Sequence, residues 1–511
     1  MDANSRTSLS IRNIVVALFY FVAATALQFV SRRVFIDNMG ADVLGLNTTA
    51  TNLLQFLNLA ELGVGAAIGY ALYKPIEAGD RHTIAEMIAL QGFIYRRVGW
   101  IVIAGAVVLS CFFPLIFAGM DLPLWYAYGT FGALLLTSLL SYFVNYRQVI
   151  MVAEQREYRF KYAYYSPMLV KTTAQIVAVA IADDPYLWWL VIQCLGVVLG
   201  AIVVRLTTRH YYPYLFGTSH NLAALKSKYP EIAANTRRLF VHRISEYVLT
   251  QTSPLIIFAC ATLTMVTYYD NYMIVVSGVL MLLQTTLNNL NPGVGNLVAT
   301  GDKANIRRVF SELFSLCFFI AAFFSILMWF LLQPLVAVWL GSQYLLPRLV
   351  LILMLAIFFI NGFRRSLDIF KDAYGLFSDV WAAGVEAVLN IGLSIAGGIL
   401  WGLPGILGGV LISQIIIVLG WKSYFVCRRG FQASPRLFWG ALCRHLPAAI
   451  AAFAALWLAL PALGINPAAS IGNFVAYAAV AVLIVTLVLL AALWLLSPGM
   501  RLLCNRLKDM L

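Results

Sequence analysis

Apolar segments long enough to cross a lipid bilayer recur from one end of this 511-residue chain to the other. A membrane-spanning helix needs about 20 mostly apolar residues, and the sequence holds about fourteen such segments. Hydrophobic residues make up 62% of the chain and charged residues 11%, whereas soluble domains average about 25% charged residues. Because lipid offers no partner for backbone N–H and C=O groups, such segments must be helical. The sequence therefore predicts an all-α polytopic membrane protein.

The predicted spans differ in length and spacing. They fall near residues 11–30, 44–73, 98–118, 124–144, 163–181, 186–204, 241–262, 267–298, 310–332, 346–363, 380–400, 404–421, 446–463 and 472–496. The segments 44–73 and 267–298 are too long for one crossing, so we expect each to extend beyond the hydrocarbon. The connections inside 163–204 and 380–421 are so short that each pair is either two helices or one merged span.

Basic residues predict the orientation. With the N-terminus inside, thirty of the 35 lysines and arginines fall in cytoplasmic segments, and only Arg32, Arg33 and Arg348 fall outside. This is the positive-inside distribution of membrane proteins. The sequence thus predicts that both termini are cytoplasmic. The net charge of +13 then reflects topology and anionic lipid headgroups, not a nucleic-acid partner.

Two halves of the sequence resemble each other weakly. The segment Asn58-x-x-Glu61-x-Gly-Val-Gly matches Asn288-x-x-Asn291-x-Gly-Val-Gly, and Gly-Asp-Arg at 79–81 matches Gly-Asp-Lys at 301–303. Six predicted spans separate the matching helices, and an even offset makes the halves parallel repeats. Two duplicated lobes are typical of transporters that work by alternating access. We therefore predict an N-lobe over 1–205, a basic cytoplasmic linker over 206–240, a C-lobe over 241–421, a cytoplasmic loop over 422–445, and two further helices with a cytoplasmic tail over 446–511.

Polar side chains form a row inside the second predicted span. On a continuous helix, Asn47, Gln55, Asn58 and Glu61 share an arc of about 120°. A carboxylate in hydrocarbon costs about 3 kcal/mol or more, so it faces a bundle interior or a watery cavity. The eighth span repeats the row with Asp270, Gln284, Asn288 and Asn291. Two interpretations are open: hydrogen bonds between helices, worth about 0.6 kcal/mol each, or the lining of a polar cavity.

Isolated charges elsewhere in the spans are further candidates. Lys171 is either an interface anchor or a cavity cation that attracts an anionic headgroup. Arg12 and Arg243 lie at the cytoplasmic starts of the first and seventh spans, and either forms local ion pairs or binds phosphate through its planar fork. Glu386 and Asn390 share a face of the eleventh span. Glu61, Asp270 and Glu386 are candidates for ion coupling, and Glu61 could equally be a structural carboxylate.

A dense group of charges precedes the eleventh span. It comprises Arg364, Arg365, Asp368, Lys371 and Asp372. Charge clusters at the ends of membrane helices are usually solvated or set the topology. We therefore expect this cluster to be solvated or to set the topology.

Signatures of catalysis are missing from the sequence. The predicted external connections are too short for a catalytic domain, and no phosphate-binding glycine loop is present. The five histidines make no metal-spaced set, and the seven cysteines form no C-x-x-C pair. The sequence therefore predicts a protein that is not an enzyme and has no metal or organic cofactor.

Several motifs resemble one transporter family. These are Arg33-Val-Phe-Ile-Asp-Asn-Met-Gly-Ala-Asp-Val-Leu-Gly-Leu-Asn47, Asn58-Leu-Ala-Glu-Leu-Gly-Val-Gly, Trp339-Leu-Gly-Ser-Gln-Tyr and Phe370-Lys-Asp-Ala-Tyr-Gly. They resemble the polysaccharide-export branch of the multidrug/oligosaccharidyl-lipid/polysaccharide exporter superfamily, over most of 1–425. One departure is Thr252-Ser253-Pro254, where relatives often carry Thr-Asp-Asn. The last two spans match only in hydrophobicity.

The resemblance implies a flippase for lipid-linked oligosaccharides, such as O-antigen or capsule repeat units, in the bacterial cytoplasmic (inner) membrane. It implies a MATE-like fold of two six-helix lobes around a cationic cavity, with two extra helices for the lipid tail. It also implies coupling to an ion gradient, of H⁺ or Na⁺, or to the membrane potential. The expected substrate is an undecaprenyl-diphosphate-linked oligosaccharide, and membrane lipids, a polysaccharide polymerase and an initiating glycosyltransferase are the expected partners. The alternatives are a multidrug or cation exporter of the same fold and a membrane glycosyltransferase or polymerase.

Overall fold

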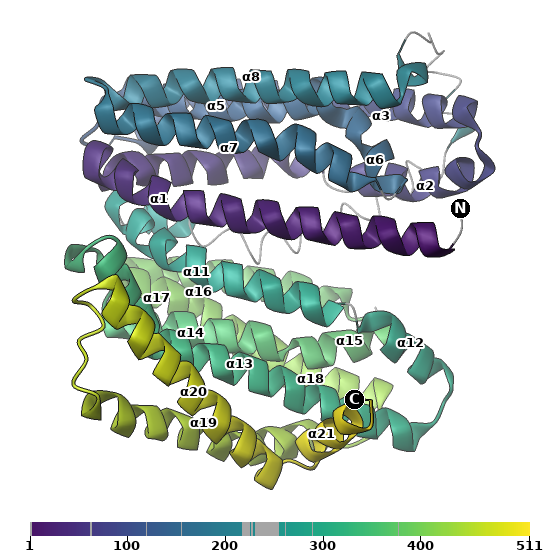
Figure 1. The fold of residues 1–511 in the computed structure, drawn as a ribbon, viewed down its shortest axis with the longest axis vertical. Coiled ribbons are helices and arrows are strands. Elements are labelled where there is room, and N and C mark those ends of the chain that lie inside the picture. The colour runs from purple at the N-terminus through teal and green to yellow at the C-terminus, as the bar shows by residue number, and fades with distance from the viewer. Residues whose placement is uncertain are drawn as a thin grey trace. The chain divides into compact units, whose positions relative to one another are not determined.

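The computed structural model describes residues 3–61, 64–118, 120–154, 156–216, 225, 228–229, 255–260, 262–288, 290–376 and 378–510. Every regular element within these ranges is helical, as the apolar pattern predicts. The chain forms two compact units, Met1–Leu255 and Ile256–Leu511. Figure 1 shows the helices of each unit.

The N-terminal unit is built around one long, divided helix. Its elements are α1 (Ala3–Leu57), η1 (Asn58–Glu61), α2 (Val64–Ala78), α3 (Arg81–Cys111), α4 (Phe113–Ile116), α5 (Leu124–Phe143), η2 (Asn145–Gln148), α6 (Val149–Ala153), α7 (Glu157–Ile181), α8 (Pro185–Tyr211) and η3 (Pro213–Leu215). Gly40 has φ 82° and divides α1 into two arms, because a left-handed residue cannot continue an α-helix. α1 packs against α5 and α7, and α8 packs against both of these helices (Figure 1).

The C-terminal unit contains the most deeply buried of the candidate spans. Its elements are α11 (Leu263–Asn288), α12 (Asn291–Ala299), α13 (Lys303–Trp339), η4 (Ser342–Tyr344), α14 (Arg348–Phe363), α15 (Arg365–Ala373), α16 (Val380–Trp401), α17 (Leu403–Gln414), a π-helical stretch (Ile415–Lys422), α18 (Ser423–Phe425), a second π-helical stretch (Val426–Gly430), α19 (Arg436–Ala462), α20 (Ile471–Leu496) and α21 (Pro498–Met510). The segment 422–445, expected as a loop, is therefore helical except at 431–435, where the chain turns into α19.

Both long polar spans are interrupted at the same motif. The second predicted span is not one helix: α1 ends at Leu57, a 3₁₀ turn covers Asn58–Glu61, and α2 begins at Val64. The eighth breaks between Asn288 and Asn291. Amide side chains compete with the backbone for hydrogen bonds, and the following glycines lower helix propensity. The expected single arc is therefore cut after Gln55 in the second span, whereas in the eighth span only Asn291 lies beyond the helix that carries the other three residues.

The second matching motif starts a helix in each half. Gly79 and Gly301 have φ of 69° and 75°, so each ends the preceding segment in the left-handed region that favours glycine. Asp80 then accepts a hydrogen bond from the Thr83 N–H at the start of α3. Asp302 does the same for α13. Each Gly-Asp pair is thus a helix stop followed by an N-cap, which explains why the two halves share it.

The two pairs of closely spaced spans are separate helices. Asp184 caps α8 and Pro185 occupies its first turn, an arrangement that begins a new helix. Gly402, with φ 61°, separates α16 from α17. Neither pair is merged.

Among the described residues, eleven helices are long and apolar enough to cross a membrane. The sequence predicts about fourteen spans, and three differences account for the gap. α1 counts once although Gly40 divides it, and α7, which carries Lys171, is not among the eleven. The predicted span 241–262 lies mostly outside the described residues. The two numbers are therefore roughly consistent.

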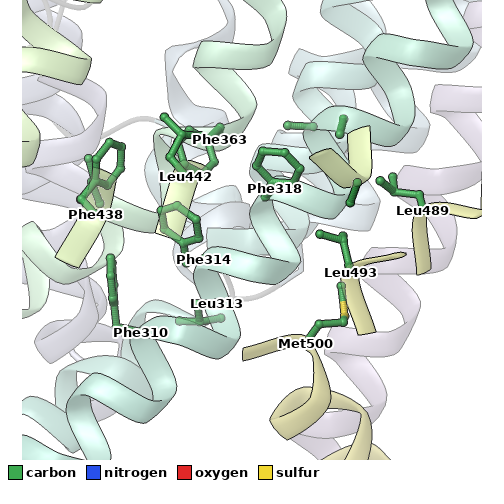
Figure 2. Close-up of a cluster of buried hydrophobic side chains, with 14 of the residues drawn as sticks. Phe310, Leu313, Phe314, Phe318, Phe363, Phe438, Leu442, Leu489, Leu493 and Met500 are labelled. Atoms are coloured by element: carbon green, nitrogen blue, oxygen red, sulfur yellow. The ribbon is translucent and has the colours of Figure 1, made fainter. Parts of the chain in front are cut away.

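The last helices of the chain pack into the core of the C-terminal unit. Figure 2 shows Phe310, Phe314 and Phe318 along α13, in one cluster with Phe363 of α14 and Phe438 of α19. A buried polar contact joins the same elements. Ser315 Oγ of α13 lies 2.9 Å from His445 Nε2 of α19 and 2.8 Å from Ser497 Oγ, just before α21.

Candidate functional site: a basic and aromatic cavity in the N-terminal unit

A cavity of about 730 Å³ lies between the first arm of α1, the start of α7 and the end of α8. Its lining residues are Arg12, Tyr158, Arg159, Tyr162, Ala163, Leu206, Thr207, His210 and Tyr211. This volume is within the range of about 300–1,000 Å³ that is usual for small-molecule sites. Arg12, a candidate from the sequence, is therefore at a cavity.

Two polar contacts hold α1 against α7 at this cavity. The Asn13 side chain accepts a hydrogen bond of 2.8 Å from the Tyr158 N–H, one of the donors that the start of a helix leaves unpaired. Further along, the Tyr20 hydroxyl lies 2.6 Å from Ser166 Oγ. Because Asn13 follows Arg12 directly, the contact that caps α7 also places Arg12 at the mouth of the cavity.

Aromatic rings position both arginines of the cavity. The Arg12 guanidinium lies 4.0 Å from the centre of the Tyr158 ring, and that of Arg159 lies 3.9 Å from the Tyr211 ring. Arg159 Nε also donates to the Tyr158 hydroxyl at 3.2 Å. Stacking orders a guanidinium while leaving its edge free for a ligand.

None of the described residues that line this cavity is acidic. Two guanidiniums and an imidazole therefore face the space with no carboxylate opposite them. Such a site attracts anions, and the planar fork of arginine matches phosphate oxygens in a two-point contact. The cavity can thus bind a phosphate-bearing group, with tyrosine rings to contact apolar or sugar faces.

Asn58 and Glu61 meet a different group of residues, at the break between α1 and α2. Asn58 donates to Ser138 Oγ at 3.0 Å and accepts from the Tyr142 hydroxyl at 2.9 Å. Glu61 accepts from the Tyr95 hydroxyl at 2.8 Å. These side chains tie the break to α3 and α5. The recorded hydrogen-bond donor to Glu61 is thus a tyrosine hydroxyl.

The other candidates of the N-terminal unit do not join either group. Asn47 has a buried side-chain oxygen without a hydrogen-bond partner among the described residues, and Gln55 is partly buried. Lys171 Nζ donates to Gln193 Oε1 of α8 at 2.7 Å. A Cβ on Gly196 would lie 2.3 Å from Lys171 Cγ, so this glycine makes room for the lysine stem. Lys171 therefore forms a contact between α7 and α8 and does not line the Arg12 cavity.

The polar row of the C-terminal unit is divided by the break after α11. Asp270 and Gln284 are partly buried on α11, and Asn288 is its last residue. Asn291 begins α12 and has a buried side-chain oxygen with no partner among the described residues. Arg243, and the departure at Thr252-Ser253-Pro254, lie outside the described residues.

Glu386 belongs to a charge network that the sequence does not predict. Asp368 pairs with Arg364 at 3.3 Å and with Lys422 of the first π-helical stretch at 2.7 Å, and Arg364 lies 4.0 Å from Glu386. The Asp368 side chain is only 13% exposed, so the expectation of a solvated cluster is wrong. The reason is that α15 turns back into the bundle, where burial of these charges requires pairing. Asn390, one turn from Glu386, has a buried oxygen without a described partner.

The tyrosines at these sites were missed by the sequence analysis. Tyr158, Tyr211, Tyr95 and Tyr142 each hold a candidate charged or amide group in place. The run of alternating aromatic and basic residues over 158–162 was the available signal, since such a run at a helix start places cations beside rings.

Neither a known family model nor a curated protein matches this sequence. Solved structures do match its fold. The lipid II flippase MurJ, in an inward closed conformation, aligns with a TM-score of 0.61 and 13% identity, covering 94% of this chain and 98% of that chain. An inward-facing multidrug resistance MATE family transporter of the MOP superfamily aligns with a TM-score of 0.53 and 13% identity, covering 78% of this chain and 93% of that chain. The chain therefore has the fold of MOP-superfamily flippases and exporters, as its repeat and its motifs predict.

Proposed function

We propose that this protein is a flippase that moves an undecaprenyl-diphosphate-linked oligosaccharide from the cytoplasmic to the periplasmic leaflet by alternating access. The prenyl tail stays in lipid while the polar head, which cannot cross hydrocarbon unaided, passes through the protein. The observation that carries the proposal is the Arg12 cavity, with two stacked arginines and no acidic side chain among its described lining residues.

The charge of this cavity favours an anionic cargo. A diphosphate carries the oxygens that paired arginines bind best, and the tyrosines of the cavity suit sugar rings. Asn47, Gln55 and Asn58 are proposed to bind sugar hydroxyls. The likeness to the MurJ fold over nearly the whole chain supports the same class of activity.

A drug or cation exporter of the same fold is the rival function. It is consistent with the MATE-like fold, but a cationic cargo would favour acidic and aromatic walls. The Arg12 cavity has basic walls, which favour the anionic lipid-linked cargo over a cation. A membrane glycosyltransferase or polymerase is less favoured, because the sequence offers no external catalytic segment.

Coupling and partners are parts of the same proposal. Glu61, Asp270 and Glu386 are proposed to contribute to coupling with H⁺ or Na⁺. A polysaccharide polymerase and an initiating glycosyltransferase are proposed as functional partners in the bacterial inner membrane, with both termini of this chain in the cytoplasm.

A deletion strain tests the function. We expect loss of surface polysaccharide and accumulation of intact lipid-linked units in the cytoplasmic leaflet, both restored by the wild-type chain. The variant Arg12→Gln should restore export at least about tenfold less well, since a charge-assisted hydrogen bond is worth about 1.5–3 kcal/mol. Arg97→Gln is the matched control, because Arg97 stacks on Phe93 at 4.3 Å but lines no described cavity.

The alternatives predict different results. Normal polysaccharide with increased drug sensitivity would replace the proposal with the exporter. Missing lipid-linked units would indicate a synthetic enzyme. Equal export by Arg12→Gln and Arg97→Gln would show that the Arg12 cavity does not contribute to export.

A further inference from the structure

A second basic cavity lies on the other side of α8 from the Arg12 cavity. It has a volume of about 190 Å³ and is lined by Arg96 of α3, by Phe143, Val144, Tyr146 and Arg147 at the end of α5 and in η2, and by Arg205 of α8. On α8, Arg205 lines this second cavity. The residues of α8 that line the Arg12 cavity are Leu206, Thr207, His210 and Tyr211. The two cavities are therefore separate sites.

Two glycines on α3 leave room for the aromatic rings that line this cavity. A Cβ on Gly92 would lie 2.6 Å from the Tyr146 ring, and a Cβ on Gly99 would lie 2.7 Å from the Phe143 ring. Because positions 92, 96 and 99 share one face of a helix, Arg96 stands between the two rings that these glycines admit. Close packing of α3 against the end of α5 thus brings Arg96 and Arg147 to one space.

The three arginines have no acidic partner among the residues that the structure describes. Within the described ranges, none of them forms an ion pair, and none of the lining residues is acidic. Arg147 stacks between Tyr146 and Phe216 at 4.5 and 4.4 Å, and its buried Nε has no hydrogen-bond partner in the part of the chain that the structure describes. Burial lowers the pKa of Arg147, the neighbouring Tyr146 raises it, and the charges of Arg205 and Arg96 lower it. Three like charges thus lie together, and no described residue supplies the counter-charge that would stabilise them.

The surroundings of the cavity resemble a surface that meets lipid. Trp100 lies one turn beyond Arg96 on α3 and is 65% exposed, and Ile202 lies one turn before Arg205 on α8 and is 46% exposed. Arginines at the edge of an exposed apolar surface match a ligand with a charged head and apolar chains.

We infer that Arg96, Arg147 and Arg205 form a binding site for a phosphate group, supplied by the headgroup of an anionic phospholipid or by free phosphate. Two-point contacts from guanidinium forks would satisfy the phosphate oxygens and the orphaned Nε of Arg147 together. The volume is below the usual range for drug-sized ligands, so the site fits a headgroup and not the large cargo of the proposed function. The inference does not depend on that function.

Thermal melting of the purified full-length protein in a neutral detergent tests the site. Three probes are added separately: dioleoyl phosphatidylglycerol, dioleoyl phosphatidylcholine and inorganic phosphate. Ligand that binds only the folded protein raises its melting temperature by mass action. We expect phosphatidylglycerol to raise it more than phosphatidylcholine, with an apparent affinity about tenfold lower for Arg96→Gln, Arg147→Gln or Arg205→Gln.

Matched controls remove the same charge from the same helices. Arg97→Gln on α3 and Arg209→Gln on α8 change residues that do not line the cavity, so both should respond to phosphatidylglycerol like the wild type. Without added anion, Arg205→Gln should melt at or above the wild-type temperature, because it relieves repulsion. A purely structural arginine would give a lower melting temperature under both conditions.

The probes also distinguish the sources of phosphate. A response to phosphatidylglycerol alone assigns the site to a lipid headgroup, and an equal response to inorganic phosphate assigns it to a free anion. If the three cavity variants and the two controls respond alike to every probe, the inference is refuted.

Discussion

The seam between α16 and α17 gives the sharpest test of how this chain packs. A Cβ on Gly405 would lie 1.9 Å from the Gly397 carbonyl oxygen, and a Cβ on Gly409 would lie 2.4 Å from the Ser394 nitrogen. The Ser394 hydroxyl donates to the Ile406 carbonyl across the same seam at 3.0 Å. These helices therefore touch backbone to backbone, the arrangement that small residues permit in membrane bundles.

The substitution Gly405→Ala should force the two helices apart. Overpacking of a closely packed contact costs about 1–3 kcal/mol, and loss of the Ser394 hydrogen bond adds about 0.6 kcal/mol. Gly408, one turn along α17, is the control, because a Cβ there meets nothing within 4 Å. Both substitutions gain the same helix propensity of about 1 kcal/mol. Gly405→Ala should therefore be less stable than Gly408→Ala by about 2–4 kcal/mol.

Unfolding in mixed detergent micelles with increasing dodecyl sulfate measures this difference. We expect Gly408→Ala to unfold at or above the wild-type midpoint and Gly405→Ala clearly below it. Equal midpoints for the two variants would show that α16 and α17 do not approach as closely as described, and the packing argument would fail.

Three further predictions concern single contacts. Glu312→Gln should destabilise the C-terminal unit by about 1–2 kcal/mol in the same unfolding assay. This loss is smaller than the loss expected on breaking a fully buried ion pair, because the two arginines paired with Glu312 are more than half exposed. Hydrogen bonds from Thr83 hold the pKa of Asp80 below its usual value. The ionised Asp80 side chain therefore stabilises the protein at neutral pH, and this stabilisation is lost as the pH falls through the lowered pKa. The melting temperature of Asp80→Ala should match that of the wild type only in acid. Tyr95→Phe removes a hydroxyl that donates to Glu61. It should lower export in the deletion strain more than Tyr128→Phe does, and equal export would assign the contact no role.

The membrane class and the repeat could be read from the sequence because both depend on local properties. Hydropathy is a sum over neighbouring residues, so it predicts spans without any knowledge of their partners. Gly79-Asp80 and Gly301-Asp302 act on their own helices as a stop and a cap, so the repeat of these residues predicts a repeat of structure. Arg12 was predicted from its place at the start of a span.

Only the tertiary structure decided where the polar helices break and which charges meet. Periodicity assumes an unbroken helix, whereas Asn58 and Glu61 bond to Ser138, Tyr142 and Tyr95 from helices distant in the sequence. The pairing of Asp368 with Lys422 and the meeting of Arg96, Arg147 and Arg205 likewise join segments far apart in the chain. Which way a side chain faces, and what lies opposite it, is set by packing between helices, and that is a non-local property no span reveals by itself.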